Sequence, residues 1–245
     1  MKILIVLLIL TLLFSCKKAE DRSCFKKEGA NISKSILLEH YEKIYLKEHL
    51  TYVLVQDTIE KIIINGGENL VNFVESSVDN KTLSIQNKNR CNFLRYNSRK
   101  IKVYIHFKTL NSIHFEGTDS LTCQDTIDLS WLNLIIRDGG GSVDLQLNAD
   151  HIYSTITNGY GDFKLSGSTN ALNIFLLTNG YCDTYDLDVK DSINIETNTP
   201  STCKIRANQS YLKGKIGGQG DVWYQGIPDS ISMIELGTGK LINKN

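Results

Sequence analysis

The chain is patterned as a series of short strands. Between residues 100 and 107 every second residue is apolar, which is the period of a strand that buries one face. The same alternation returns over residues 82–86, 152–156 and 163–165, with turn residues between the runs. Almost no stretch repeats apolar residues every three or four positions, as an amphipathic helix would. The pattern therefore predicts an all-β protein.

A glycine-containing motif recurs from residue 110 onward. It begins at positions 139, 159, 180, 199, 218 and 237, which are 19 to 21 residues apart, and Gly117 stands one repeat earlier. Each motif lies between two short alternating strands, so one repeat consists of two or three strands and a corner. Such a unit cannot bury its apolar face alone, whereas stacked units bury it against one another.

The repeat predicts a single-stranded β-solenoid, or β-helix, with coils of about 20 residues. Glycine suits the corner because it adopts a positive φ without steric cost. A β-sandwich built from regular hairpins is the alternative. The nearly constant spacing of one corner motif favours the solenoid.

The first 15 residues have the pattern of a secretion signal. Lys2 precedes an apolar run over residues 3–10 that resumes over 12–14. A helix of about twelve residues is only ~18 Å long, well short of the ~30 Å hydrocarbon core of a membrane. The residues before Cys16 resemble the lipobox of bacterial lipoproteins, which predicts cleavage before Cys16 and acylation of that cysteine. A plain signal peptide with a chance cysteine is the alternative.

The segment after the acylated cysteine bears on location. Residues 17–21, Lys-Lys-Ala-Glu-Asp, resemble the export tag of surface lipoproteins in Bacteroidetes. We expect a lipid anchor in the outer membrane, with display at the cell surface favoured over a periplasmic orientation. The predicted organisation is a signal peptide over residues 1–15, a lipidated tether over 16–31 and one β-solenoid domain over 32–245.

An exported protein meets oxidising conditions, so its cysteines can form disulfides. Five of the six cysteines remain once the lipid-bearing one is set aside. Their spacing pairs Cys24 with Cys91, and Cys182 with Cys203, which lie in adjacent repeats at positions of equal strand parity. Cys123 is then expected to be a buried, unpaired thiol. No cysteine has a second cysteine or a histidine at metal-ligand spacing, so no metal site is predicted.

The charge balance excludes one class of partner. The chain has 27 Lys and Arg against 27 Asp and Glu, and loss of Lys2 with the signal peptide leaves 26 against 27, a net charge of −1. A surface that binds nucleic acid normally shows a basic excess. Two prolines and 41% apolar residues argue against a disordered chain. The sequence thus predicts a folded, exported domain with no nucleic-acid partner.

Several segments together resemble one known family. They are Cys24-Phe25, Gly67-Glu68-Asn69-Leu70, Leu83-Ser84-Ile85, Asn89-Arg90-Cys91-Asn92 and the closing run from Gly218 to Pro228, followed by Gly237-Thr238-Gly239. On these segments the chain is similar to the head GIN domain family, described as putative autotransporter adhesins and common in Bacteroidetes. The resemblance implies a right-handed β-helical stack in the cell envelope, and it brings no catalytic residue. Residues 199–201, Thr-Pro-Ser, depart from the glycine pattern, so a reshaped corner is expected there.

Two sets of corner residues could contact a ligand. Asp162, Asp183 and Asp221 follow the motif in three coils, and Tyr160 and Tyr181 take the same motif position in adjacent coils. Coils stacked about 4.8 Å apart would align each set. Aligned carboxylates could bind calcium or act on a polysaccharide, and aligned tyrosines could stack on sugar rings. We favour the structural alternatives, which are turn hydrogen bonding for the aspartates and strand filling for the tyrosines.

A tripeptide of Asp, Ser or Thr, and an aliphatic residue occurs five times, beginning at residues 57, 119, 125, 191 and 229. It resembles the O-glycosylation tripeptide of exported Bacteroidetes proteins. A turn that ends in Asp and a hydroxyl residue before the next strand explains it equally well. Both interpretations can hold together, because such turns are exposed.

The chain has no nucleophile elbow, no zinc-protease helix motif and no phosphate-binding loop. We therefore expect a non-enzymatic lipoprotein, without a cofactor, whose solenoid binds a polysaccharide or a surface protein. A polysaccharide-active β-helix enzyme and a purely structural envelope protein are the alternatives. Clustered acidic and basic residues in one groove would favour the enzyme, whereas a flat exposed aromatic face would favour binding.

Overall fold

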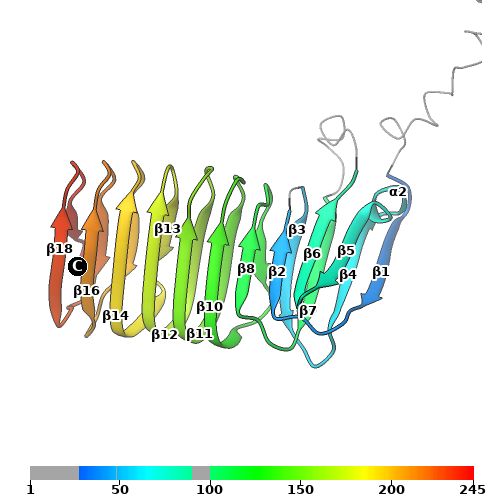
Figure 1. Cartoon of the computed structure of the whole chain (residues 1–245), viewed down its shortest axis with the longest axis horizontal. Helices are drawn as coiled ribbons and strands as arrows, with labels where there is room; N and C mark the ends of the chain where they lie inside the picture. Colours follow the sequence, from blue (N-terminus) through cyan, green and yellow to red (C-terminus); the bar gives the residue numbers. More distant parts are fainter. Residues whose placement is uncertain (1–27, 48, 90–99) are drawn as a thin grey trace, which may run out of the picture.

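The computed structural model describes residues 28–47, 49–89 and 100–245 (Figure 1). The predicted signal peptide, most of the tether, and Cys16, Cys24 and Cys91 lie outside these residues. The described strands form an elongated stack, with the first strands of the chain at one end and the last at the other (Figure 1).

The described residues form strands of 3 to 16 residues and one helical turn. In chain order they are β1 (Asn31–Leu37), β2 (Lys43–Leu46), β3 (Thr51–Gln56), β4 (Lys61–Gly67), α2 (Glu68–Val71), β5 (Val74–Asp79), β6 (Thr82–Asn87), β7 (Lys102–Phe107), β8 (Ser112–Phe115), β9 (Leu121–Cys123), β10 (Ile127–Ile136), β11 (Ser142–Ile156), β12 (Asp162–Leu177), β13 (Tyr181–Thr184), β14 (Leu187–Asn198), β15 (Cys203–Arg206), β16 (Tyr211–Ile216), β17 (Val222–Gln225), β18 (Ser230–Glu235) and β19 (Leu241–Asn243).

The chain forms a β-solenoid of about seven turns, as the repeat predicted. Face 1 consists of β8, the C-terminal halves of β10, β11, β12 and β14, and then β16 and β18. Face 2 consists of β9, the N-terminal halves of β11 and β12, and then β13, β15, β17 and β19. Neighbouring strands within both faces are parallel, whereas a hairpin sandwich would pair them antiparallel. The sandwich alternative is therefore wrong.

The N-terminal part departs from a simple succession of coils. The coil β2–β3 lies between the coils β6–β7 and β8–β9, because β2 pairs with both β6 and β8, and β3 with both β7 and β9. These strands extend faces 1 and 2 toward the N-terminal end. There β5 pairs antiparallel with β6, and β4 lies antiparallel between β7 and β1. The glycine repeat, which starts later in the chain, did not predict this arrangement.

The core is a set of apolar rows to which each coil contributes one side chain. On face 2, Leu121, Val143 and Phe163 stand in register and are buried. On face 1, Ile136 and Ile156 do the same. Each such side chain contributes about 1.5–3 kcal/mol relative to an exposed one. Because side chains alternate, every second residue of a strand points outward, and these residues are the ones available for a site.

The corner glycines are explained by close approach more than by backbone conformation. A Cβ atom on Gly139, Gly218 or Gly237 would come closer than 3.0 Å to backbone atoms of the preceding coil. Among the described glycines that begin the motif, Gly159 alone has a positive φ, of 95°. The expectation that positive φ selects glycine is thus wrong for most corners. Coils packed this closely leave no room for a side chain.

Hydroxyl groups stand at the corner over residues 199–201, where the glycine pattern is interrupted. Thr199 Oγ1 donates to the carbonyl of Gly180 at 3.0 Å and accepts from the N–H of Ser201 at 3.1 Å. Ser201 Oγ donates to the carbonyl of Asn179 at 3.2 Å. These side-chain bonds join the corner to the preceding coil.

Candidate functional site

The corner residues do not align as the repeat predicted. Tyr181 is the register partner of Asp162 and not of Tyr160, and Asp183 is the partner of Lys164. The motif begins 21 residues apart in these two coils, at 159 and 180, but the strands that follow are in register at a spacing of 19. The corner absorbs the difference of two residues. The predicted tyrosine and aspartate ladders therefore do not form.

Asp183 instead belongs to a row of alternating charge on face 2. Asp144, Lys164, Asp183 and Lys204 follow one another in register across four coils. Lys204 Nζ lies 3.4 Å from Asp183 Oδ2, and Lys164 Nζ lies 2.9 Å from Asp186 Oδ2. Opposite charges on neighbouring strands stabilise a sheet and offset each other. The row is therefore unlike the concentrated carboxylates that calcium or a glycosidase site requires.

The two predicted tyrosines have different environments. Tyr160 is 75% exposed on its corner. Tyr181 is half-buried, its hydroxyl donates to Asp183 at 3.2 Å, and its ring centre lies 5.7 Å from Lys204 Nζ. Asp162 beside it is also half-buried, and burial raises the pKa of its carboxyl. Tyr181 therefore contacts Asp183 and Lys204 of the charged row. Tyr160 is accessible to a ligand, but no second aromatic ring stands in register with it.

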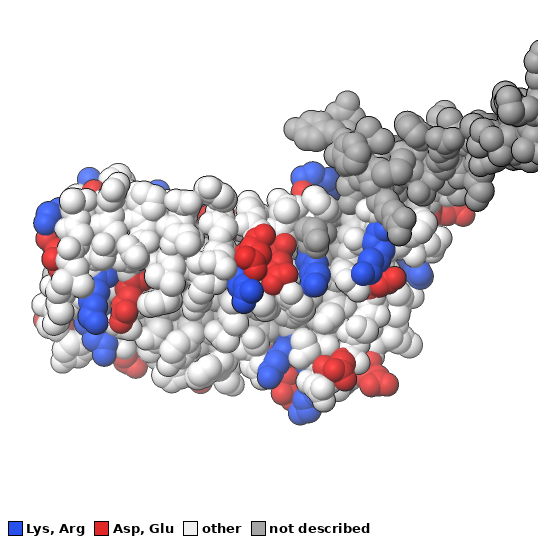
Figure 2. All heavy atoms as spheres, turned by 45° about the horizontal axis from the view of Figure 1, so that its top comes forward, with Lys and Arg blue, Asp and Glu red and all other residues white. Residues whose placement is uncertain are grey.

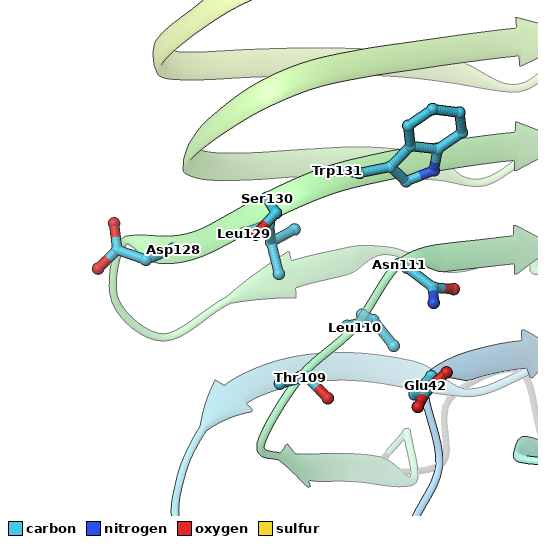
Figure 3. A pocket seen from close by; sticks show the side chains of 8 residues that line it. All are labelled: Glu42, Thr109, Leu110, Asn111, Asp128, Leu129, Ser130 and Trp131. Carbon is cyan, nitrogen blue, oxygen red and sulfur yellow. The ribbon is translucent and has the colours of Figure 1, made fainter.

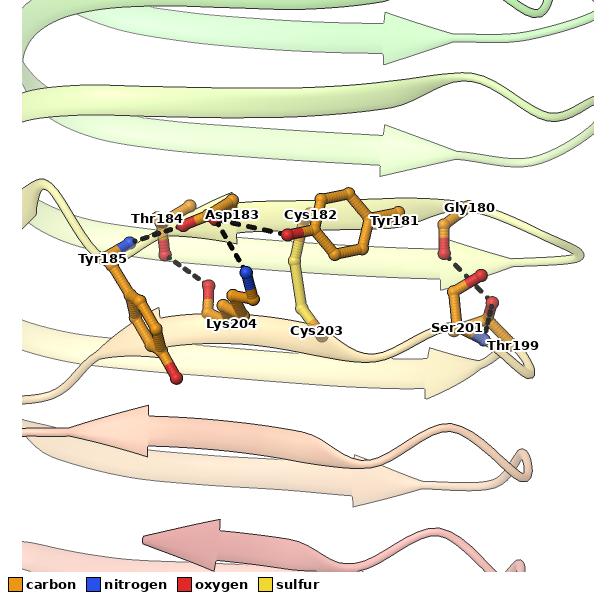
Figure 4. Close-up of a disulfide and its surroundings, with 10 residues drawn as sticks. All are labelled: Gly180, Tyr181, Cys182, Asp183, Thr184, Tyr185, Thr199, Ser201, Cys203 and Lys204. Atoms are coloured by element: carbon orange, nitrogen blue, oxygen red, sulfur yellow. Dashed lines mark hydrogen bonds and ion pairs between the residues drawn. A yellow bond between two sulfur atoms is a disulfide. The ribbon is translucent and has the colours of Figure 1, made fainter. Parts of the chain in front are cut away.

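The predicted disulfide between Cys182 and Cys203 is confirmed (Figure 4). The two cysteines are register partners on β13 and β15, their Cα atoms are 5.0 Å apart, and both are buried. They occupy inward positions in the row that contains Phe163 and Val222, so the bond joins two coils inside the core. Cys123 is unpaired as predicted, but it is half-exposed and not buried.

Histidines near the N-terminal end pair with carboxylates. His106 Nδ1 lies 2.9 Å from Asp57 Oδ2, and this contact is the largest of several that lower the pKa of Asp57 to about 2. His40 lies 2.8 Å from Glu60 and 3.3 Å from Glu42, and both contacts raise its pKa. Within residues 28–47, 49–89 and 100–245, no group of three or more His, Cys, Asp or Glu side chains is placed to hold a metal ion. No helix in the same residues is long and apolar enough to cross a membrane.

A different surface is present on face 1, where nine outward-facing residues of β10, β11 and β12 form a block of three register rows. The rows are Trp131–His151–Ala171, Asn133–Tyr153–Asn173 and Ile135–Thr155–Phe175. The block has no Lys, Arg, Asp or Glu, and we call it the uncharged patch. Figure 2 shows a largely white area below the corner loops, with charged side chains on both sides of it along the stack.

Trp131 and Tyr153 form the centre of the uncharged patch. Their rings are stacked, with centroids 4.9 Å apart and planes 29° apart, and the residues are 46% and 39% exposed. Asn133 and Asn173 flank Tyr153 in its row. The rings offer a flat apolar surface at small entropic cost, and the neighbouring amides can donate and accept hydrogen bonds. This combination can stack on a sugar ring and bind its hydroxyl groups.

A groove of about 280 Å³ adjoins the patch (Figure 3). It lies between residues 109–111 and the first half of β10, and Trp131 borders it while its ring leans away toward the next coil (Figure 3). The carbonyl of Asn111 accepts a bond from the N–H of Asn133 at 2.9 Å, which joins the groove wall to the row of Tyr153. The groove and the uncharged patch are therefore adjoining parts of one candidate site.

Trp131 and Tyr153 lie outside the corner motif, so the motif did not point to them. The two residues are 22 positions apart, which is one coil of 20 residues plus two. That spacing makes them diagonal neighbours on adjacent strands, within reach of large side chains. A search for aromatic residues with outward parity in consecutive repeats would have found the pair.

The chain is similar to one protein family and to several solved structures. Residues 40–228 match a family described as "Putative auto-transporter adhesin, head GIN domain". A putative adhesin from Bacteroides fragilis has a similar structure, with a TM-score of 0.76 and 22% identity over 88% of this chain and 97% of that one. A putative adhesin from Parabacteroides distasonis has a TM-score of 0.64 and 17% identity, over 88% and 98% of the two chains.

A further structure from Parabacteroides distasonis, described as a putative lipid binding protein, has a TM-score of 0.58 and 18% identity, over 89% and 98% of the two chains. At these identities the structures show a shared fold. A comparison with curated proteins gave no match. The family match extends over most of the chain and agrees with the observed β-solenoid. The chain belongs to the head GIN domain family.

Proposed function

We propose that this protein is a non-enzymatic adhesin of the bacterial surface that binds a glycan through the uncharged patch on face 1. The observation that carries the proposal is the exposed, stacked pair of Trp131 and Tyr153, flanked by the amides of Asn133 and Asn173. Burying an exposed aromatic pair against the apolar side of a sugar ring is favourable, and the amides satisfy the hydroxyl groups at its edge. The family match supports an adhesin role.

The anchoring part of the proposal rests on the sequence. Cys16 would carry the lipid, and residues 17–31 would connect it to the solenoid. Two or more acyl chains give stable membrane attachment, whereas one gives only reversible binding. Expression in a lipoprotein-processing host should give a membrane-bound protein, and Cys16→Ser should release it. Equal membrane attachment of the two forms would contradict a lipid anchor at Cys16.

The geometry supports binding over hydrolysis. A glycosidase generally needs two carboxyl groups facing each other across the scissile bond. The groove is bordered by two acidic residues. Glu42 accepts from Lys81 at 2.8 Å, and the Asp128 carboxylate points away from the groove (Figure 3). On face 2, Asp183 is paired with Lys204, and Lys164 is paired with Asp186.

The first experiment is affinity electrophoresis of the chain from Lys17 onward, with Cys16 absent, through gels that contain bacterial or host polysaccharides. Retardation by one polysaccharide should be lost in Trp131→Ala/Tyr153→Ala. Tyr211→Ala is the matched control, since Tyr211 is 59% exposed, lies in the register row of Trp131 and belongs to a coil beyond the patch. Tyr160→Ala tests the corner. Unchanged mobility in every gel would contradict the proposed function, and loss of binding in Tyr160→Ala alone would move the site to the corner.

A further inference from the structure

The C-terminal end of the stack leaves its apolar core open. Ile231 of β18 continues the inward row of Leu212, which is 1% exposed, but Ile231 itself is 45% exposed. On the same strand Ile234 is 52% exposed, and Leu236 directly after the strand is 71% exposed. These residues belong to the last coil, at the red end of the stack in Figure 1. A further layer of strands would bury this apolar surface.

The opposite end of the stack is protected. There α2 packs against β1 and β4, and its residues Leu70 and Val71 are buried in the core. The edge strand β1 carries Lys34 between Ile32 and Ile36, on the side that faces the core. A charge at an inward position of an edge strand opposes the addition of another sheet. Within the described residues, no helix covers the C-terminal end in this way.

Both strands of the last coil have a free edge. Among the strands of the described residues, β18 pairs only with β16, and β19 only with β17. Their outer edges therefore present backbone N–H and C=O groups that a further strand can bond. Neither strand contains the proline or lysine that commonly blocks an edge. The C-terminal end can thus accept one added strand on each face.

Charged residues at the ends of the two strands determine which strands fit. Asp229 and Glu235 stand at the two ends of β18, Lys240 and Lys244 flank β19, and all four are exposed. The corner at residues 237–239 reverses the chain between the two strands. Antiparallel pairing of β18 with β19 of a second copy therefore brings each acidic residue beside a lysine. Pairing β18 with β18, and β19 with β19, would instead bring like charges together.

We propose that the open C-terminal end binds the same end of a second copy of this chain, with β18 of each copy antiparallel to β19 of the other. The contact is two-fold symmetric, so it closes as a dimer, and the two apolar cores become continuous. The protected N-terminal ends point away from each other and add no further copies. This inference does not depend on the glycan site, which lies on β10, β11 and β12 and remains exposed in the dimer.

The test measures the mass of the chain from Lys17 onward by sedimentation equilibrium over a range of micromolar concentrations. Wild type should form a dimer and no larger species. Ile231→Lys gives this end the kind of inward charge that Lys34 supplies at the other, and it should weaken the dimer about a hundredfold. Leu37→Lys is the matched control, because Leu37 is 76% exposed on β1 at the opposite end. It should leave the dimer unchanged.

Charge exchange tests the strand pairing without altering the apolar residues. Asp229→Lys/Glu235→Lys and Lys240→Glu/Lys244→Glu should each weaken the dimer, since each places like charges at both ends of the paired strands. An equimolar mixture of the two variants should dimerise again, because every acidic residue then meets a lysine. Circular dichroism of each variant shows that it is folded.

Three results would overturn the proposal. The first is a wild-type chain that stays monomeric over the whole range or grows beyond a dimer. The second is a dimer that Leu37→Lys weakens and Ile231→Lys does not, which would move the contact to the N-terminal end. The third is a mixture of the two folded charge variants that stays monomeric.

Discussion

The two faces of the solenoid are built by the same coils but present opposite surfaces. Face 2 carries the charged row of Asp144, Lys164, Asp183 and Lys204, with a disulfide beneath it. Face 1 carries the uncharged patch, with its stacked rings open to solvent. Inward positions are similar on both faces, since each coil must bury an apolar row. The difference therefore lies in the outward positions, where packing imposes the weakest constraint.

This contrast separates residues that hold the coils together from residues that are available to a partner. In the charged row Lys204 pairs with Asp183, and Lys164 pairs with the neighbouring Asp186, so a ligand would have to replace those contacts. The rings of the uncharged patch are exposed and its amides half-buried, and no residue of the patch is charged. Substitutions on face 2 should thus change stability and leave ligand binding intact, and substitutions in the patch should do the reverse.

The largest expected effect is loss of the disulfide beneath face 2. Cys182 and Cys203 are 21 residues apart, and closure of such a loop contributes about 3 kcal/mol in the chain-entropy model. The variant Cys182→Ala/Cys203→Ala should therefore lower the free energy of unfolding in urea by about that amount. Glycan binding by the folded fraction should not change. Reduction of the wild-type protein should reproduce the loss, and a variant as stable as wild type would show that the bond adds nothing to the stacked coils.

The sequence was sufficient for the class of fold and for this disulfide. Alternation of period two and a corner motif every 19 to 21 residues predict stacked coils, and equal strand parity in adjacent repeats predicts the pair Cys182–Cys203. It was not sufficient for the first coils. Placement of β2–β3 between β6–β7 and β8–β9 depends on long-range pairings, which leave no period in the sequence.

The site was harder to predict than the fold, because it depends on register at single-residue precision. A corner that absorbs two residues moved Tyr181 beside Asp162 and placed Asp183 next to Lys164. A shift of that kind leaves the fold unchanged and reassigns every outward neighbour. Trp131 and Tyr153 lie on strands of regular 20-residue spacing, so their contact was predictable in principle.

The second largest effect is expected from reversing a charge in the charged row. Asp183→Lys would place three ammonium groups in succession with Lys164 and Lys204, and it would remove the acceptor for the Tyr181 hydroxyl. We expect a loss of about 1 kcal/mol in the free energy of unfolding, and a smaller loss at high salt, because the row is partly exposed and its charges are screened. Asp183→Asn should give a smaller change. A salt-independent loss would indicate that the hydrogen bonds, and not the charges, stabilise the row.

Introducing a lysine into the uncharged patch should lower the affinity for the glycan and leave the stability of the fold nearly unchanged. Asn173→Lys introduces a long charged side chain beside Tyr153 and removes an amide from its row. Affinity for the glycan should fall about fivefold, which corresponds to about 1 kcal/mol, while the free energy of unfolding changes by less than about 0.5 kcal/mol. Calorimetry and urea unfolding of the same preparation give both values. If stability fell and affinity did not, the contrast between the two faces would be wrong.

The smallest expected effect is an acid sensitivity at Asp57, which follows β3 at the N-terminal extension of face 2. His106, on the extension of this face through β7, and the N–H of Thr58 together lower the pKa of Asp57 to about 2, below its ordinary value of 3.8. A carboxyl whose pKa is lower in the folded state stabilises that state above the unfolded pKa, and this contribution is lost as the pH falls from about 4 toward 2. Asp57→Asn should therefore flatten the decline of the unfolding free energy over this range, whereas the exposed Asp188→Asn should leave the decline as it is in wild type. Identical profiles for Asp57→Asn and wild type would mean that the contact with His106 does not persist in solution.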